Sequence, residues 1–86
     1  MKRDRRVPAD AVELGTVSNI VHHWSDGDVL QWETLYRASD GSAYVHRYYP
    51  NGEPYGWGNS MTHYDGPYAA LRLEAEMNLN QVPEAS

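Results

Sequence analysis

Three dipeptides divide the chain and constrain its fold more than any other feature. Asp26-Gly27, Asp40-Gly41 and Asn51-Gly52 each lie between runs rich in Val, Thr, Tyr and Trp. Asp-Gly and Asn-Gly tolerate the positive φ angles that two-residue hairpin turns require. Three such turns in series predict a four-stranded antiparallel β-meander, with strands over roughly 14–24, 29–38, 43–49 and 55–63.

A helix signal follows the last predicted strand. Asp65-Gly66-Pro67 supplies a cap residue and an early proline, and the Ala/Leu/Glu-rich stretch over 67–80 is followed by Pro83. The fold class we expect is therefore α+β, a four-stranded antiparallel β-meander with one C-terminal α-helix packed on one face. We expect residues 1–12 to form a flexible basic N-terminal arm, residues 13–82 a single α+β domain, and residues 83–86 a C-terminal tail.

Counting outward from two-residue loops predicts which residues share a face of the sheet. The first turn places Val21 opposite Trp32, and the second places Tyr36 opposite Val45. Directly opposed residues share a face, and a slip of one residue would invert the assignment. We expect the helix on the more aliphatic of the two faces, which would carry Val17, Val21, Leu30, Trp32, Tyr36, Ala38, Ala43 and Val45.

The other face is expected to carry a row of rings. The chain has seven Tyr, three Trp and no Phe, so every aromatic side chain except the histidines combines an apolar ring with a polar tip. The third turn would place Tyr48 opposite Tyr55 and His46 opposite Trp57. Tyr and Trp are enriched at interface hot spots, so we expect a water-facing ridge that binds a partner, although this face is equally compatible with the core or a homodimer seam. The ridge comprises Tyr44, His46, Tyr48, Tyr55 and Trp57.

Charge is distributed unevenly along the chain. The first six residues carry a net +3, and the remaining eighty carry a net −8. An acidic body repels phosphate backbones and attracts basic partners, so this pattern favours binding of a basic protein. Nucleic acid would be held only through the N-terminal arm. The acids at the hairpin tips, which would steer such a partner by long-range attraction, are Asp26, Asp28, Asp40 and Glu53.

The predicted helix carries two apolar stripes on nearly opposite sides. Tyr68, Leu71, Ala75 and Leu79 form one of them at helical spacing. One stripe is expected to pack on the sheet, and the other is left for a partner or a second copy of the chain. The candidate dimer stripe consists of Ala70, Leu73 and Met77.

Metal binding and catalysis have weak support in the sequence. His22 and His46 would share a face but lie about 16 Å apart on standard strand spacings, and His63 with Asp65 supplies too few ligands for zinc. Ser60, His63 and Asp65 are the residue types of a catalytic triad but lack the loop signatures that accompany one. We therefore expect no metal, no cofactor and no enzymatic activity.

Small size, acidity, the lack of cysteine and the meander-plus-helix plan resemble small phage-encoded inhibitors, including the anti-CRISPR type. The resemblance covers no motif, so it assigns no role to any residue. It implies a non-enzymatic inhibitor of a basic, nucleic-acid-handling host protein. The alternatives are a homodimeric structural protein, or single-stranded nucleic-acid or carbohydrate binding through the aromatic face.

The sequence also predicts a cytoplasmic protein that does not enter a membrane. It has no apolar run near the ~20 residues that a membrane span needs. Its charged N-terminus is not followed by the apolar segment of a signal peptide. The absence of cysteine fits a reducing compartment.

Overall fold

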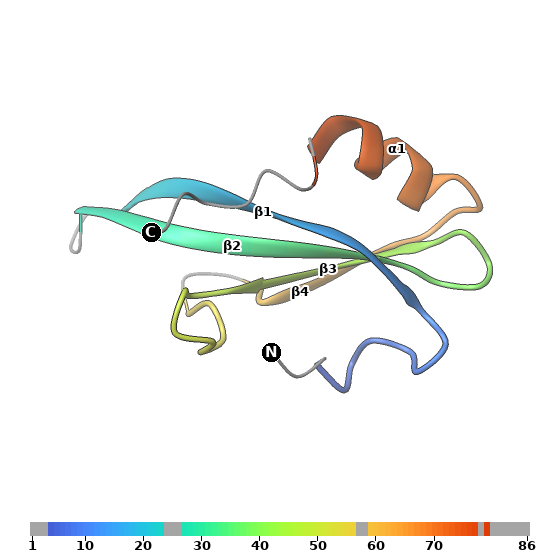
Figure 1. Cartoon of the computed structure of the whole chain (residues 1–86), viewed down its shortest axis with the longest axis horizontal. Coiled ribbons are helices and arrows are strands. Elements are labelled where there is room, and N and C mark those ends of the chain that lie inside the picture. Colours follow the sequence, from blue (N-terminus) through green and yellow to red (C-terminus); the bar gives the residue numbers. More distant parts are fainter. Residues whose placement is uncertain (1–3, 24–26, 57–58, 78, 80–86) are drawn as a thin grey trace.

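The chain folds into one antiparallel sheet with a single C-terminal helix. The computed structural model describes residues 4–23, 27–56, 59–77 and 79. The sheet order is β1-β2-β3-β4, each strand antiparallel to its neighbour, and α1 packs on the sheet (Figure 1). The expected α+β meander with one C-terminal helix is confirmed. The elements are β1 (Val12–His23), β2 (Gly27–Arg37), β3 (Ala43–Tyr48), β4 (Met61–Tyr64) and α1 (Ala69–Met77).

Different segments cover the two faces of the sheet. Helix α1 lies over one face, here called the helix face, and residues 4–11 run beneath the opposite face, here called the N-terminal face (Figure 1). Val7 and Ala11 are buried with Tyr36 of β2 in a small cluster on the N-terminal face. Residues 4–11 therefore pack against the sheet, where the sequence suggested a free arm.

Between β2 and β3, residues 39–41 form a three-residue loop closed by Ala38 and Ser42, and this length sets the register of both strands. The Ala38 amide donates to the Ser42 carbonyl at 2.9 Å, and the Gly41 amide donates to the Ala38 carbonyl at 3.0 Å. Gly41 has a φ of 90°, and Asp40 Oδ1 accepts the Ser42 amide at 2.9 Å. A tight turn followed by a glycine at positive φ is the usual three-residue hairpin loop, so the expected two-residue loop is wrong.

The turn after β3 repeats this arrangement. The Tyr49 amide donates to the Glu53 carbonyl and the Gly52 amide donates to the Tyr49 carbonyl, both at 2.8 Å, with a φ of 91° at Gly52. Asn51 Oδ1 accepts the Glu53 amide at 2.9 Å. Pro50 is the first loop residue, and its ring holds φ near −65°. In the predicted two-residue loop of Asn51 and Gly52, Pro50 would pair with Glu53, but proline has no N–H to donate to the Glu53 carbonyl, so Pro50 disfavours that loop.

The longer loop inverts the predicted faces of β2 and β3 relative to one another. Tyr36 lies opposite Tyr44, and Leu35 lies opposite Val45. The prediction placed Tyr36 opposite Val45, one residue out of register. Because side chains alternate along a strand, Leu35 joins Val45 on the helix face, and Tyr36 moves to the N-terminal face.

The first and third hairpins also differ from the prediction. Val21 lies opposite Val29 rather than Trp32, because His23 pairs with Gly27. Strand β4 begins at Met61, which lies opposite His46. The position opposite Tyr48 is taken by Pro54, in an isolated bridge, where Tyr55 was expected. Asp26 and Trp57, and hence the predicted pairing of His46 with Trp57, lie outside the described residues.

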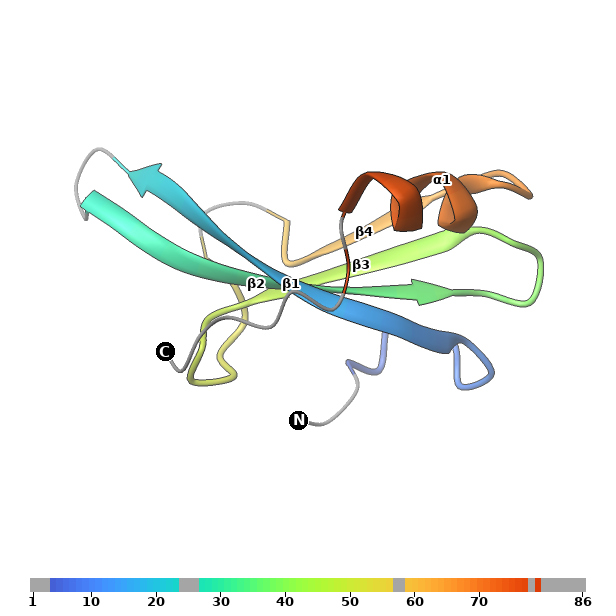
Figure 2. The ribbon, with the colours of Figure 1, turned by 45° about the horizontal axis from the view of Figure 1, so that its top comes forward.

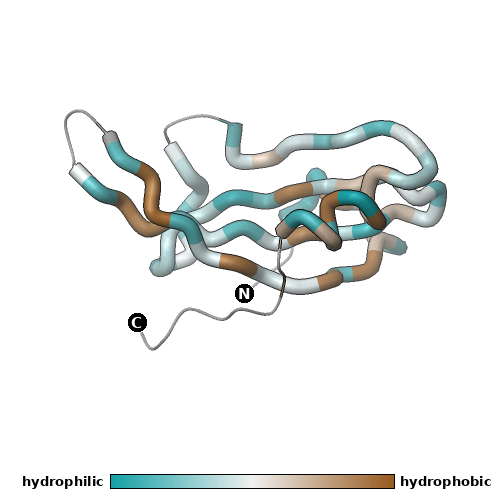
Figure 3. The backbone as a smooth tube through the Cα atoms, turned by 90° about the horizontal axis from the view of Figure 1, so that it is seen from above, coloured by the Kyte–Doolittle hydropathy of each residue, from teal (hydrophilic) through white to brown (hydrophobic). Residues whose placement is uncertain are grey.

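The main core lies between α1 and the helix face. Leu35 and Val45 are the largest fully buried side chains, and Ala43, Ala69 and Ala70 complete the cluster. Two alanines at the start of α1 allow its backbone to approach the sheet, and the Ala70 amide donates to the Gly41 carbonyl at 3.1 Å. In Figure 3, α1 lies over the sheet and alternates between apolar and polar positions.

The candidate dimer stripe is part of this core. Ala70 is fully buried, and Leu73 and Met77 pack against the same cluster, so this stripe is not left over for a second copy. The sheet needs an apolar cover, and these residues provide it. The opposite side of the helix is the unpacked one, with Tyr68 72% exposed and Leu71 65% exposed.

Strands β1 and β2 extend beyond the rest of the sheet. Strand β3 pairs only with residues 32–37 of β2, so residues 19–23 and 27–31 form a two-stranded ribbon that projects past β3 and β4 (Figure 2). Ile20 on this ribbon is 71% exposed.

Candidate binding site

The residues predicted to form a water-facing ridge are mostly buried. His46 and Tyr48 are each 5% exposed, Tyr55 is 7% exposed, and Tyr44 is half-buried. His46 and Tyr44 lie on the N-terminal face, where residues 4–11 cover part of the sheet. The expectation of an exposed ridge is therefore wrong for these four residues, and for Tyr44 and His46 the cause is the N-terminal segment that packs on this face. Their role in partner binding stays a prediction.

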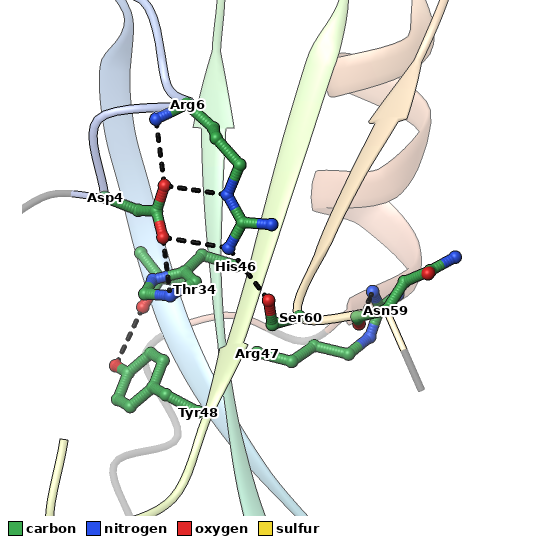
Figure 4. A network of polar contacts seen from close by, with 8 residues as sticks. All are labelled: Asp4, Arg6, Thr34, His46, Arg47, Tyr48, Asn59 and Ser60. Atoms are coloured by element: carbon green, nitrogen blue, oxygen red, sulfur yellow. Dashed lines mark hydrogen bonds and ion pairs between the residues drawn. The ribbon is translucent and has the colours of Figure 1, made fainter. Parts of the chain in front are cut away.

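A polar network fastens the N-terminal segment to the sheet (Figure 4). The Asp4 carboxylate accepts the Arg6 amide at 2.8 Å and the Arg6 guanidinium through Nε and Nη2, each at 2.9 Å. Arg6 Nη2 also donates to Ser60 Oγ at 2.8 Å, and His46 Nε2 lies 3.6 Å from Asp4 Oδ2. The network thus links the first described residues to β3 through His46 and to the chain just before β4 through Ser60.

The pKa values of Asp4 and His46 are both lowered, but for different reasons. The hydrogen bond from Arg6 lowers the pKa of Asp4 to about 2, so this carboxylate is ionised at neutral pH. Burial lowers the pKa of His46 below its usual 6.5, against the opposing attraction of Asp4. His46 is therefore neutral at pH 7, and the network needs no buried imidazolium.

Three hydroxyl groups form a chain across the N-terminal face. Thr16 Oγ1 lies 2.9 Å from Thr34 Oγ1, which lies 2.9 Å from the Tyr48 hydroxyl. The three residues come from β1, β2 and β3. The Tyr48 ring is tilted against the Trp32 ring, with centroids 6.0 Å apart. Strand register thus gathers hydroxyls and rings that are far apart in the sequence.

A pocket of about 480 Å³ opens beside this hydroxyl chain. Ligand pockets typically measure about 300–1,000 Å³, so it is large enough for a small group. Among the described residues that line it, the one with a charge is the exposed Glu13 of β1. The turn at 50–52 forms one side of the pocket. The remaining lining residues are Thr16, Trp32, Thr34, Tyr36 and Tyr48.

Trp32 carries an unsatisfied donor in this lining. Its indole Nε1 is buried and has no hydrogen-bond partner within the described structure. A buried polar group without a partner is uncommon in native proteins and calls for an explanation such as an absent ligand or water. The sequence analysis assigned Trp32 to the helix-covered face and did not single out Glu13. The Asp40-Gly41 dipeptide fits a three-residue loop as well as a two-residue loop, so the sequence held no signal that would have placed Trp32 on the N-terminal face.

Carboxylates gather at the end of the sheet where β2 leads into β3. Val12 lies opposite Arg37, and Ala43 lies opposite Tyr64, so the segments at 10–13, 38–42 and 65–68 all lie at this end. Pro67 lies against Gly41 there. This acidic end, as we call it, also holds the exposed Arg37 and comprises the exposed carboxylates of Asp10, Glu13, Asp40 and Asp65.

The acids predicted to steer a partner do not form one patch. Asp40 belongs to the acidic end, whereas Asp28 lies at the opposite end of β2, with its Oδ1 3.0 Å from His22 Nδ1. Glu53 lies in the turn after β3 and is exposed. Steering by these residues stays a prediction, and the structure distributes them along a molecule 39 Å long.

Three histidines, His22, His46 and His63, each lie beside one carboxylate. Among residues 4–23, 27–56, 59–77 and 79, no three His, Cys, Asp or Glu side chains gather in a way that could hold a metal ion. His63 Nε2 lies 3.6 Å from Asp65 Oδ1, and its ring stacks on Tyr44. Ser60 Oγ, the nucleophile of the triad considered above, is bonded to Arg6.

Comparison with known proteins finds no relative. A scan against protein-family models and searches of curated proteins and of solved structures give no match to this chain. In the part of the chain that is described, no helix combines the length and apolar character needed to cross a membrane.

Proposed function

We propose that this chain is a non-enzymatic binding module that docks on a basic protein through its acidic end. The observation that carries the proposal is the charge that remains exposed after the internal ion pairs form. Carboxylates that project into solvent attract a positively charged surface, accelerate encounter and fix orientation.

The fold uses part of its positive charge internally. Arg6 is paired with Asp4, and Arg47 Nε donates to Glu33 Oε2 at 2.9 Å. In the described part of the chain, the exposed arginines outside these pairs are Arg5, Arg37 and Arg72. Eight exposed acids stand against these three: Asp10, Glu13, Asp28, Asp40, Glu53, Asp65, Glu74 and Glu76. These exposed groups sum to −5, so the ion pairs leave the whole net negative charge of the chain on the surface.

The acidic end also offers apolar contact area. Val12 is 49% exposed, and Tyr68, which directly follows Pro67, is 72% exposed. An exposed tyrosine beside carboxylates combines an anchor that buries much area with a rim that selects charge. This combination favours a protein partner over a simple counter-ion.

We further propose that the partner handles nucleic acid and that the chain inhibits it in the cytoplasm. Proteins that bind nucleic acid present lysines and arginines to phosphates. An acidic surface can occupy those groups in place of the phosphate backbone. Direct binding of nucleic acid is disfavoured by the same charge, and Arg6, one cation of the N-terminal segment, is already tied to Asp4.

The experiment that tests this function is capture of a partner at two salt concentrations. The tagged chain is incubated with lysate of the organism that encodes it, and captured proteins are identified by mass spectrometry. Raising the salt from about 0.1 M to about 1 M shortens the Debye length from about 10 Å to about 3 Å. We expect a basic protein to be captured at low salt and released at high salt.

A pair of charge variants locates the docking surface. Asp40→Asn combined with Asp65→Asn removes two charges from the acidic end, and Asn at position 40 keeps the oxygen that accepts the Ser42 amide. Glu74→Gln with Glu76→Gln removes two charges from α1 as a control. We expect the first pair to slow association with the purified partner about three- to tenfold. If the two pairs of variants slow association equally, or if capture does not depend on the salt concentration, the acidic end is not the docking surface.

A further inference from the structure

The pocket on the N-terminal face has a lining suited to a cation. We infer that it receives the side chain of an arginine from the partner, an inference that rests on the proposed function. Glu13 belongs both to the pocket lining and to the acidic end. A partner docked on that end would therefore have the pocket within its footprint.

The lining offers acceptors and a ring rather than positive charge. Of the described residues that line the pocket, none is Lys, Arg or His. Glu13 supplies a carboxylate, and the half-buried Thr16 supplies a hydroxyl oxygen. A guanidinium has five N–H donors and no acceptor, so it matches groups that accept hydrogen bonds.

Trp32 provides the surface on which a guanidinium would stack. Its side chain is partly exposed in the pocket and tilted against Tyr48. A cation over the face of a tryptophan is attracted by the ring quadrupole, and arginine is the more frequent partner. A planar guanidinium can stack on the ring while it donates to a carboxylate at its edge.

The unsatisfied indole favours a peptide over a free cation. Trp32 Nε1 is buried without an acceptor among the described residues, so a ligand reaches it only if the indole ring turns toward the pocket. A guanidinium cannot accept this proton, but the main chain of a bound peptide carries carbonyl groups that can. Phosphate and other anions fit the lining poorly, because its one charged group is a carboxylate.

The test is an NMR titration with two matched peptides. Acetyl-Gly-Arg-Gly-amide is added to the ¹⁵N-labelled full chain, and acetyl-Gly-citrulline-Gly-amide, a neutral isostere, serves as the control. The indole N–H signal of Trp32 is assigned with Trp32→Phe. We expect a saturable shift of this signal with the arginine peptide and binding of the citrulline peptide weaker by about fivefold or more.

Variants of two exposed glutamates distinguish the effect of the pocket carboxylate from the effect of the net charge of the chain. Glu13→Gln removes the pocket carboxylate, and Glu76→Gln makes the same chemical change on α1, on the far side of the sheet. Each is exposed, so neither should disturb folding. We expect Glu13→Gln to weaken the arginine peptide about threefold and Glu76→Gln to change it less than about 1.5-fold.

Three results would overturn the inference. An indole signal that moves with neither peptide shows that the pocket does not take the side chain. Equal binding of the two peptides shows that charge is not recognised. A neutral trisaccharide that shifts the signal where the arginine peptide does not assigns the pocket to a sugar. If the arginine peptide does not bind the pocket but a basic protein is still captured in a salt-sensitive way, the proposed function stands and only this inference is wrong. If the peptide binds but no basic protein is captured, the pocket binds arginine and the proposed function is wrong.

Discussion

The two faces of this sheet are held down by different physical means. The helix face is closed by side chains without polar atoms, with Leu35 and Val45 almost completely buried beneath Ala69 and Ala70. The N-terminal face is closed by a short segment that buries two small side chains, Val7 and Ala11, against Tyr36 and adds the polar contacts of Asp4 with Arg6 and His46. One cover is hydrophobic, and the other combines a small apolar cluster with an ion pair.

This difference suggests separate roles for the two faces, with folding stability on the helix face and ligand binding on the N-terminal face. Burial of a large apolar side chain contributes about 1.5–3 kcal/mol, while a partly exposed ion pair contributes about 0–1 kcal/mol. The helix face is therefore expected to carry most of the folding free energy. The N-terminal face carries less, and its hydroxyls, rings and pocket remain available for a ligand.

The largest effect is expected from truncation of the central residue of the helix face. Leu35→Ala should lower the free energy of unfolding by about 2–5 kcal/mol, because it removes apolar contacts and leaves a cavity. Leu35 has no exposed surface. Chemical denaturation monitored by circular dichroism would measure the loss.

Ile20→Ala is the control for this change, because Ile20 is mostly exposed on the projecting ribbon. It should cost less than about 0.5 kcal/mol. Similar losses for the two variants would mean that the helix face is not the main source of stability.

A smaller effect is expected where the helix meets the β2–β3 turn. A Cβ atom at Gly41 would lie 2.0 Å from the Pro67 carbonyl oxygen, and the backbone there has positive φ. Gly41→Ala should cost about 2–4 kcal/mol, from the strained backbone and from displacement of the chain before α1.

Gly27→Ala provides the matched comparison. Gly27 also has positive φ, but a Cβ atom there would meet nothing within 4 Å, so the cost should be only the backbone term of about 1 kcal/mol. The difference between the two thermal or denaturant midpoints measures how tightly the turn holds the helix. Equal midpoints would mean that the contact with Pro67 relaxes freely.

The smallest effect is expected from the N-terminal face and should depend on pH. Asp4 has a folded pKa of about 2, below the usual 3.8, so its contribution is present above pH 3.8 and is lost as pH falls toward 2. Asp4→Asn should remove about 0.2–1 kcal/mol at neutral pH and flatten the stability profile in that acidic window. Denaturation at a series of pH values would measure it.

His46 adds a second, separate window. Its pKa is lowered by burial, so the unfolded chain binds a proton more readily than the folded chain below pH 6.5. Stability should therefore fall as pH decreases through that region in both the parent and the Asp4→Asn variant. A profile without any decline below pH 6.5 would contradict the buried, neutral state of His46.

Element identity could be predicted from local residues, but the pairing between elements could not be predicted from glycine positions alone. Asp40-Gly41 and Asn51-Gly52 correctly mark reversals, yet each glycine occupies the third loop position rather than the second. That single residue moves Tyr36 to the opposite face. Only the third hairpin carried a partial warning, since Pro50 has no N–H to donate in the closing pair of a loop formed by Asn51 and Gly52.

The candidate site could be predicted less well than the fold. The pocket depends on Glu13, Trp32 and the turn at 50–52 being brought together by strand pairing. Among the described aromatic residues selected from the sequence, only Tyr48 lines the pocket. No local sequence pattern predicted that residues 4–11 would pack on the sheet.

The sequence by itself determined four strands, their antiparallel order and a C-terminal helix, because turn residues and apolar periodicity act over a few neighbouring positions. Tertiary structure alone decided which side chains face the helix and which stay near water. Those outcomes depend on loop length to the single residue and on competition between covering segments for each face of the sheet. Both are properties of the whole chain, since a period of two converts a one-residue shift into the opposite face.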